Sequence, residues 1–411
     1  MPNERRMLLL LSLVYFTYIL DYMLMPALTL FFTRSFSLEP RELGILVSAY
    51  NFSASAFGII GALFIDRFNR KHALVALYGG FAVSMLLCGV ALSLQILITA
   101  RVLAGAFGGL IVATIFSIIG DVIEPDKQGA AFGLTLSSFA VSSVAGVPLG
   151  LWLAETIGWN MIFIINAAAS LLVLVAVSLQ MPDLTAHLSR LKAETTTSHL
   201  RKLLHRNGIA AIGVTALIAM ASYSVIPFIN PFLAANVGLG DAEIRYFYIA
   251  GGIATFLASY PTGLIADKFG KWNTFAALSA LLVPSTLLFT TMPSSTYAAL
   301  MLVFVLFMTL SRARRAPALA MITSSVAPSE RAGFMSLNIS IEQLASGIAA
   351  SLAGAVIIKT PNAPMENYFV VGIGSAGCAV LAAVLLYVVK PAVISSVTPL
   401  SPTLQAGKSA A

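Results

Sequence analysis

ALFIDRFNRK at residues 62–71 is the stretch that decides the fold, because GLIADKFGK at residues 263–271 nearly repeats it 201 residues later. The same interval of 201 residues separates Glu42 from Glu243, so an acid precedes an apolar run and an Asp follows it in both places. Self-similarity at a fixed interval is typical of a duplicated architecture. The sequence therefore predicts two homologous halves.

The composition is that of a membrane protein. Of 411 residues, 58% are hydrophobic and 10% are charged, whereas soluble domains hold about 25% charged residues. A helix needs about 20 apolar residues to cross a bilayer. The chain has twelve such runs, at residues 8–32, 43–64, 74–94, 96–119, 130–153, 161–181, 208–234, 244–266, 273–291, 297–325, 334–358 and 368–389. Because backbone amides in lipid need partners within their own segment, we expect an all-α membrane protein with twelve transmembrane helices in two pseudo-symmetric six-helix bundles.

Polar segments divide the chain into parts. The expected parts are an N-terminal six-helix bundle at 1–181, a cytoplasmic linker at 182–207, a C-terminal six-helix bundle at 208–390 and a disordered cytoplasmic tail at 391–411. The linker composition is typical of a solvated tether, and an amphipathic surface helix is the alternative. The first run follows Arg5 and Arg6 as a signal peptide would, but no small-residue cleavage pattern follows it, so we expect a retained helix.

Basic residues indicate the orientation. With an even number of helices and both ends inside, sixteen of the 24 Lys and Arg fall at inner loops and ends, and four fall outside. Short loops rich in Lys and Arg stay in the cytoplasm. We therefore expect a multi-pass protein of the bacterial inner membrane with both termini cytoplasmic, and we attribute the net charge of +7 to this bias rather than to nucleic-acid binding.

Several classes of site are not supported by the sequence. Cys88 and Cys378 lie in separate apolar runs without metal-ligand spacing. The Gly407-Lys408-Ser409 segment lacks the earlier glycine of a phosphate-binding loop. We expect no enzyme activity, no cofactor and no metal, and a monomer whose partners are a small-molecule substrate, protons and the lipid bilayer.

The repeated stretch resembles a motif of the major facilitator superfamily, and specifically of its twelve-helix drug:proton antiporter branch. That family carries Gly-x-Leu-Ala-Asp-Arg-x-Gly-Arg-Lys between its second and third helices, and residues 263–271 match it closely. The copy at 62–71 has Ala62 and Asn69 where glycines are usual. Asn tolerates a left-handed turn, so Asn69 is a mild departure.

Two further motifs are similar to this branch. Arg101, followed by Gly105 and Gly109, is similar to the family's proton-coupling pattern in the fourth helix. GVPLG at residues 146–150 resembles the Gly-Pro motif of antiporters in the fifth helix. The residues of this helix-five motif are Gly146, Pro148 and Gly150. Ordinary close packing of helices is the alternative role for such glycines, and a proline lets the helix bend.

The resemblance implies a conformational lock on the cytoplasmic side. Asp66 would dock against the start of the eleventh helix near Gly333, where free backbone amides attract a carboxylate. Arg70 and Asp121 would complete the charge cluster, and Asp267 is the counterpart of Asp66 in the second half. A solvated carboxylate that merely ends a helix is the alternative.

Ionisable side chains within the apolar runs are few. Of 17 acids, Asp21 and Glu342 fall well inside a run, and the four histidines fall in loops. A charge in the membrane costs about 2.5–3.5 kcal/mol, so such residues usually have a function. We expect Asp21 to be the proton carrier, with Arg101 as the partner that protonation releases; a static ion pair is the alternative. Glu342 is the second candidate for proton coupling, or else part of a polar cavity wall.

A central cavity is expected where polar side chains recur at helical spacing beside Asp21. The expected cavity residues are Tyr18, Tyr22, Tyr50, Asn51, Tyr223, Asn230 and Arg314. Arg312 and Arg315 share a helix face and Arg314 points elsewhere. Two alternatives stay open: the helix ends near Ser311, or it continues and one arginine faces the cavity, which would favour an anionic substrate.

These features together predict proton-coupled export of a small organic molecule, a drug or a metabolite, by alternating access. Proton-linked uptake of a metabolite is the alternative within transport. A non-transporting membrane sensor or scaffold is the alternative from another class, and the buried Asp21 and Arg101 argue against it.

Overall fold

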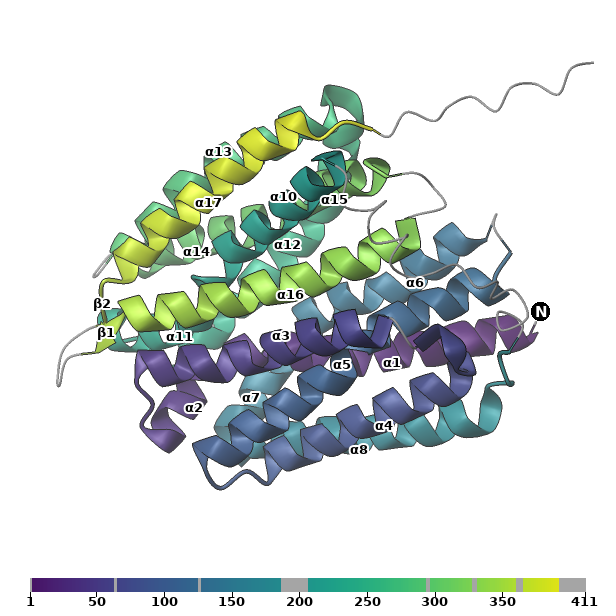
Figure 1. Cartoon of the computed structure of the whole chain (residues 1–411). Helices are drawn as coiled ribbons and strands as arrows, with labels where there is room; N and C mark the ends of the chain where they lie inside the picture. Colours follow the sequence, from purple (N-terminus) through teal and green to yellow (C-terminus); the bar gives the residue numbers. More distant parts are fainter. Residues whose placement is uncertain are drawn as a thin grey trace, which may run out of the picture.

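The computed structural model describes residues 2–62, 65–124, 127–185, 206–292, 296–326, 331–359 and 365–391. In these ranges, twelve helical segments are long and apolar enough to cross a membrane. They form two halves that lie side by side (Figure 1). The expected all-α fold is confirmed. Most of the expected linker and nearly all of the expected tail lie outside the described residues.

The first half holds six of the spans. Its elements are α1 (Pro2–Ala27), α2 (Thr29–Phe36), α3 (Pro40–Ala62), η1 (Ile65–Arg67), α4 (Arg70–Gly89), α5 (Leu94–Val122), α6 (Gln128–Val141), η2 (Ser142–Gly146), α7 (Val147–Ile157) and α8 (Trp159–Gln180). The fifth span runs through α6, η2 and α7, with η2 as a π-helical turn. Pro148 is the second residue of α7, just after this turn. Because proline has no N–H and its ring crowds the preceding turn, the widened turn accommodates it within a continuous span.

The second half holds the other six spans and a short hairpin. Its elements are α10 (Arg206–Tyr223), η4 (Ile226–Phe228), α11 (Ile229–Phe232), η5 (Leu233–Val237), α12 (Asp241–Phe269), α13 (Lys271–Thr291), α14 (Tyr297–Ala313), α15 (Arg315–Ser324), α16 (Arg331–Val356), β1 (Ile358–Lys359), β2 (Met365–Glu366) and α17 (Tyr368–Val388). The two strands pair antiparallel, with Ile358 opposite Glu366.

The tenth span settles the alternatives that the sequence left open around its arginines. The helix does not end near Ser311; α14 passes through one turn residue, Arg314, into α15, and the span continues to Ser324. Pro317 in the first turn of α15 explains the interruption, because a proline cannot donate to the carbonyl four residues earlier.

The halves meet along two pairs of helices. α3 packs along α16, and α12 packs along α7 and η2. Gly44 in α3 faces Gly354 in α16, where a Cβ on Gly44 would lie 2.6 Å from the carbonyl oxygen of Ala350. This approach needs glycine, since small residues let membrane helices come together.

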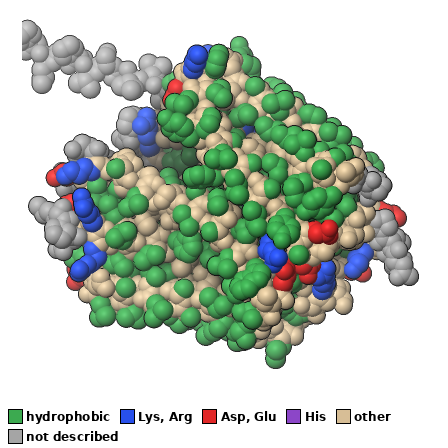
Figure 2. All heavy atoms as spheres, turned by 180° about the vertical axis from the view of Figure 1, so that it is seen from behind, with side chains coloured by type: hydrophobic (Ala, Val, Ile, Leu, Met, Phe, Trp, Pro, Cys, Tyr) green, Lys and Arg blue, Asp and Glu red, His purple; other side chains and the backbone are tan. Residues whose placement is uncertain are grey.

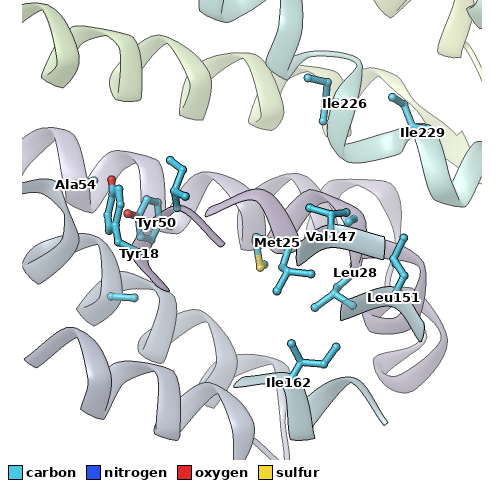
Figure 3. Packing of buried hydrophobic residues seen from close by; sticks show 14 of the residues in the cluster. Tyr18, Met25, Leu28, Tyr50, Ala54, Val147, Leu151, Ile162, Ile226 and Ile229 are labelled. Carbon is cyan, nitrogen blue, oxygen red and sulfur yellow. The ribbon is translucent and has the colours of Figure 1, made fainter. Parts of the chain in front are cut away.

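The two ends of the molecule differ in how the halves meet. We call the end where α1 begins and α17 ends the terminal end, and the other end, with α2 and the hairpin, the opposite end (Figure 1). The main hydrophobic core draws residues from both halves, such as Met25, Val147 and Ile226. Figure 3 shows this packing between α1, α7 and η4. A second core, from Ala211 to Val389, comes from the second half alone and lies at the terminal end.

The outer surface is largely apolar. Leu172, Leu179 and Tyr260 are each at least 74% exposed. Figure 2 shows hydrophobic side chains over the middle of one face, with Lys, Arg, Asp and Glu gathered toward the two ends. This distribution suits a protein whose middle contacts lipid tails.

Candidate functional site

A buried ion pair lies at the centre of the first half. Arg101 of α5 donates from Nη1 to both carboxylate oxygens of Asp21 in α1, at 2.8 and 3.0 Å. The two side chains are 1% and 0% exposed. The guanidinium carbon also lies 4.7 Å from the centre of the Tyr50 ring. The structure thus brings together the acid and the arginine that sequence reasoning singled out, and a charge pair so deeply buried depends on both partners.

Tyrosines connect this pair with the second half. The Tyr22 ring lies 6.1 Å from that of Tyr50 and 6.0 Å from that of Tyr223, which belongs to α10. A small cavity touches Tyr22, Tyr50, Asn51, Arg101 and Tyr223. Arg101 of the ion pair therefore borders a cavity that Tyr223 of the second half also lines.

A larger cavity lies between the halves beside these tyrosines. Its walls come from α1, η2 and α7 on one side and from α10, η4, α12 and α14 on the other. The lining residues are Tyr22, Met23, Pro26, Ser143, Val147, Tyr223, Ile226, Tyr248, Gly251, Gly252, Thr255, Phe304, Met308 and Arg312. Of the expected cavity residues, Tyr22 and Tyr223 lie here; we call this space the central cavity.

The remaining expected cavity residues lie elsewhere. Tyr18 is buried beside Phe81, 5.8 Å away between ring centres, and Figure 3 shows it next to Tyr50. Asn51 donates to its own helix, to the Val47 carbonyl at 3.0 Å, while it touches the smaller cavity. Asn230 donates across the halves to the Ala27 carbonyl at 2.5 Å. Asn230 thus holds the halves together rather than lining the central cavity.

The arginine in the central cavity is Arg312, not Arg314. Arg314 is fully buried within the second half, where Nη1 lies 3.4 Å from the Ser279 hydroxyl and the guanidinium faces the Phe275 ring. Arg312 lines the central cavity and lies 5.4 Å over the ring of Phe139 in α6. The expectation for Arg314 is corrected because the helix rotates by about 100° per residue, so adjacent positions face different neighbours.

Glu342 is held in an ion pair. Arg315 donates from Nη2 to the Oε1 of Glu342, joining α15 to α16 within the second half. These side chains are 37% and 19% exposed, so this carboxylate is less enclosed than Asp21. Sequence reasoning gave Glu342 as the second candidate for proton coupling, or else as part of a polar cavity wall, and did not predict its partner.

The helix-five glycines, Gly146 at the end of η2 and Gly150 in α7, pack the fifth span against α1. A Cβ on Gly146 would lie 2.6 Å from Leu20, and one on Gly150 would collide with Leu24. Pro148 is buried between them in sequence. Close packing is thus a demonstrated role of these glycines, and Val147 between them reaches the central cavity.

The expected lock is described in part. Arg70 donates from Nε to Asp121 at 3.2 Å, joining α4 to α5 at the terminal end. The Asp66 side chain and its expected contact lie outside the described residues, and Asp267 is exposed. The backbone of Asn69 is not in the left-handed conformation, whereas its counterpart Gly270 has a φ of 94°. The Asn69 side chain instead caps α4 by accepting a hydrogen bond from the Lys71 amide at 3.0 Å.

Sequence reasoning missed the contacts that close the opposite end. Arg34 of α2 pairs with Asp241 of α12 at 2.7 Å, and Glu155 of α7 pairs with Arg245 of α12 at 2.5 Å. The hydroxyl of Ser351 in α16 donates to Ser48 in α3 at 2.9 Å. The charges could be read from the sequence, but nothing in it joins residues some 90 to 300 positions apart.

The chain matches a known family over nearly its whole length. The sequence model of the Major Facilitator Superfamily matches residues 10–217 and again residues 211–406. Because the same model matches twice, each half carries the family's pattern.

Relatives and solved structures agree with this match. Two relatives from Bacillus subtilis are the "uncharacterized MFS-type transporters" YceJ, 26% identical over 60% of this chain and 62% of its own length, and YtbD, 22% identical over 76% and 78%. The match thus spans less than two thirds of YceJ. A crystal structure of a D-xylose-proton symporter has a TM-score of 0.75 at 13% identity, over 95% of this chain and 98% of that one. A bacterial homologue of the human lysosomal transporter Spinster has a TM-score of 0.69 at 18% identity, over 95% and 96%.

Proposed function

Because the chain belongs to the major facilitator superfamily, it is a multi-pass membrane transporter rather than an enzyme, and we propose that it exports a small organic molecule in exchange for protons. The observation that carries this proposal is the Asp21–Arg101 pair, which is fully buried and borders the small cavity that Tyr22 and Tyr223 also line. Burying two charges at this depth costs free energy, so a purely static structural role for the pair is disfavoured.

Proton binding to Asp21 is the proposed coupling step. A protonated Asp21 no longer neutralises Arg101, and an unpaired buried arginine destabilises the arrangement that encloses it. The halves then rearrange so that Arg101 contacts water or pairs with another residue. A membrane potential contributes about 2.3 kcal/mol per charge per 100 mV, which supports modest uphill export. Glu342, in its less enclosed pair with Arg315, is the second candidate for this role.

The orientation and the lock belong to the same proposal. With both termini in the cytoplasm of a bacterial cell, the terminal end faces inward and the closed opposite end faces outward. Asp66, Arg70 and Asp121 then form the cytoplasmic lock of the alternate state, and the Arg70–Asp121 contact supports this. We propose that one chain suffices, because both walls of the central cavity come from it.

The direction of transport rests on the motif of the fifth span. Residues 146–150 are similar to the Gly-Pro motif of the twelve-helix drug:proton antiporter branch, which favours export over uptake. The π-helical turn before Pro148, next to the central cavity, supports a specialised role for this segment.

The test is substrate-driven proton movement. A toxicity screen in cells with and without the protein identifies an exported compound, and proteoliposomes with a pH-sensitive dye inside then report proton flux when it is added. We expect flux opposite in direction to the compound, loss of flux in Asp21→Asn, and normal flux in Glu39→Gln, which makes the same charge change at an exposed site. Flux in the same direction indicates uptake. Undiminished gradient-driven transport by Asp21→Asn refutes the coupling role.

A further inference from the structure

We propose that the transported molecule is an organic anion with an apolar body, and that Arg312 binds its anionic group in the central cavity. This inference rests on the proposed transport function and deepens it by naming the substrate class. It starts from the balance of charge around the tenth span.

Positive charge exceeds negative charge at this level of the second half. The tenth span carries Arg312, Arg314 and Arg315, and one carboxylate, that of Glu342, is engaged by Arg315. Arg314 is fully buried, and its Nε and Nη2 atoms have no hydrogen-bond partner among the described residues. Asp21 cannot compensate, since both of its oxygens are bonded to Arg101. Among the described residues of this region, the cations therefore outnumber the anions by two.

Arg312 is the member of this group that a ligand can reach. It lines the central cavity and is partly exposed, and it forms no ion pair with any residue in the described part of the chain. Its guanidinium faces Phe139, a residue of the other half, so it spans the space between the halves. Burying a cation is unfavourable unless it is paired, and a guanidinium matches a carboxylate with two parallel hydrogen bonds.

The other cavity walls define the rest of the ligand. Tyr248 also lines the central cavity, so its hydroxyl can donate to the same anion. Met23, Met308 and Phe304 supply flexible and aromatic apolar surface. A molecule with one anionic group and a hydrocarbon or aromatic body can pair with Arg312 and pack against the apolar surface. An organic cation would be repelled by Arg312.

Three probes with one apolar body test this inference. The full-length protein in detergent is titrated with 4-phenylbutanoate, 4-phenylbutanamide and 4-phenylbutylammonium, and binding is followed by thermal shift and calorimetry. We expect the carboxylate to bind at least about tenfold more tightly than the amide, because a hydrogen bond to a charged group is typically worth that much. The ammonium compound should bind most weakly.

Matched variants assign the preference to Arg312. Arg312→Gln should remove the preference for the carboxylate, Arg312→Lys should keep most of it, and Arg41→Gln, the same charge change at an exposed site, should leave it unchanged. Equal or tighter binding of the amide or the ammonium compound, no binding of any probe, or a preference that survives Arg312→Gln overturns the inference. If Arg312→Gln does not fold, the test is whether the wild type and Arg312→Lys both bind the carboxylate more tightly than the amide.

The binding assay uses no proton gradient, so the two proposals fail separately. Carboxylate binding without proton movement refutes coupled transport and leaves the anion site intact. Proton movement driven by organic cations but not by carboxylates leaves coupled transport intact and refutes the anion site.

Discussion

Replacing Glu155 by Gln tests how the opposite end is held closed. Glu155 and Arg245 come from different halves, lie 2.5 Å apart and are only 18% and 17% exposed. A hydrogen bond to a charged group at such a site contributes about 1.5–3 kcal/mol. Because each 1.4 kcal/mol is a factor of ten, the equilibrium for opening this end should rise about 10- to 100-fold.

The Arg34–Asp241 pair provides an internal comparison. It joins the same two halves at 2.7 Å, but its side chains are 51% and 26% exposed. Exposed pairs contribute about 0.2–1 kcal/mol, so Arg34→Gln should increase opening by at most about fivefold. The difference between the two variants follows from solvent exposure alone.

A cysteine at position 48 reports the opening. Ser48 is 2% exposed where α3 meets α16, so Ser48→Cys should react with a membrane-impermeant thiol reagent only when the opposite end opens. The background carries Cys378→Ser, and Cys88 is fully buried. Labelling should accelerate in Glu155→Gln far more than in Arg34→Gln, and Arg41→Gln should match the parent. Equal rates in all variants, or a larger effect of Arg34→Gln, refute the reasoning.

Three further predictions follow from the same contacts. Asp21→Asn and Arg101→Gln should each lower the free energy of unfolding by about 3–5 kcal/mol, because each leaves a buried charge unpaired. In thermal unfolding, the double variant should regain most of this loss. Losses that simply add would show that the two side chains act independently. Gly44→Leu should prevent the approach of α3 to α16 and raise labelling at position 48, while Gly374→Leu, which meets nothing within 4 Å, should not; normal labelling of Gly44→Leu would contradict the packing argument. Glu342→Gln should free Arg315 and tighten binding of 4-phenylbutanoate by about fivefold in calorimetry, and weaker binding would show that Glu342 serves the ligand directly.

Much of the fold could be predicted because it depends on local sequence. The length and apolarity of each run fix the twelve spans, and the repeat at 62–71 and 263–271 fixes the two halves. Asp21 and Arg101 stood out because ionisable groups in apolar runs are rare. Their pairing was a reasonable expectation, since few partners were available to either.

The remaining site residues depend on how helices rotate and pack. Arg312 and Arg314 differ little as sequence neighbours, yet one lines the central cavity and the other is enclosed against Ser279. Asn230 looked like a cavity residue and instead bonds to Ala27 across the halves. No local pattern distinguishes these outcomes.

By itself, the sequence determined an all-helical membrane protein of two related halves with a charge pair placed within the membrane. Tertiary structure alone decided which arginine meets the central cavity, and which charges of α2, α7 and α12 join at the opposite end. The physical reason is that transfer into lipid depends on the composition of each segment, whereas contacts between helices depend on the rotation and register of segments far apart in the chain.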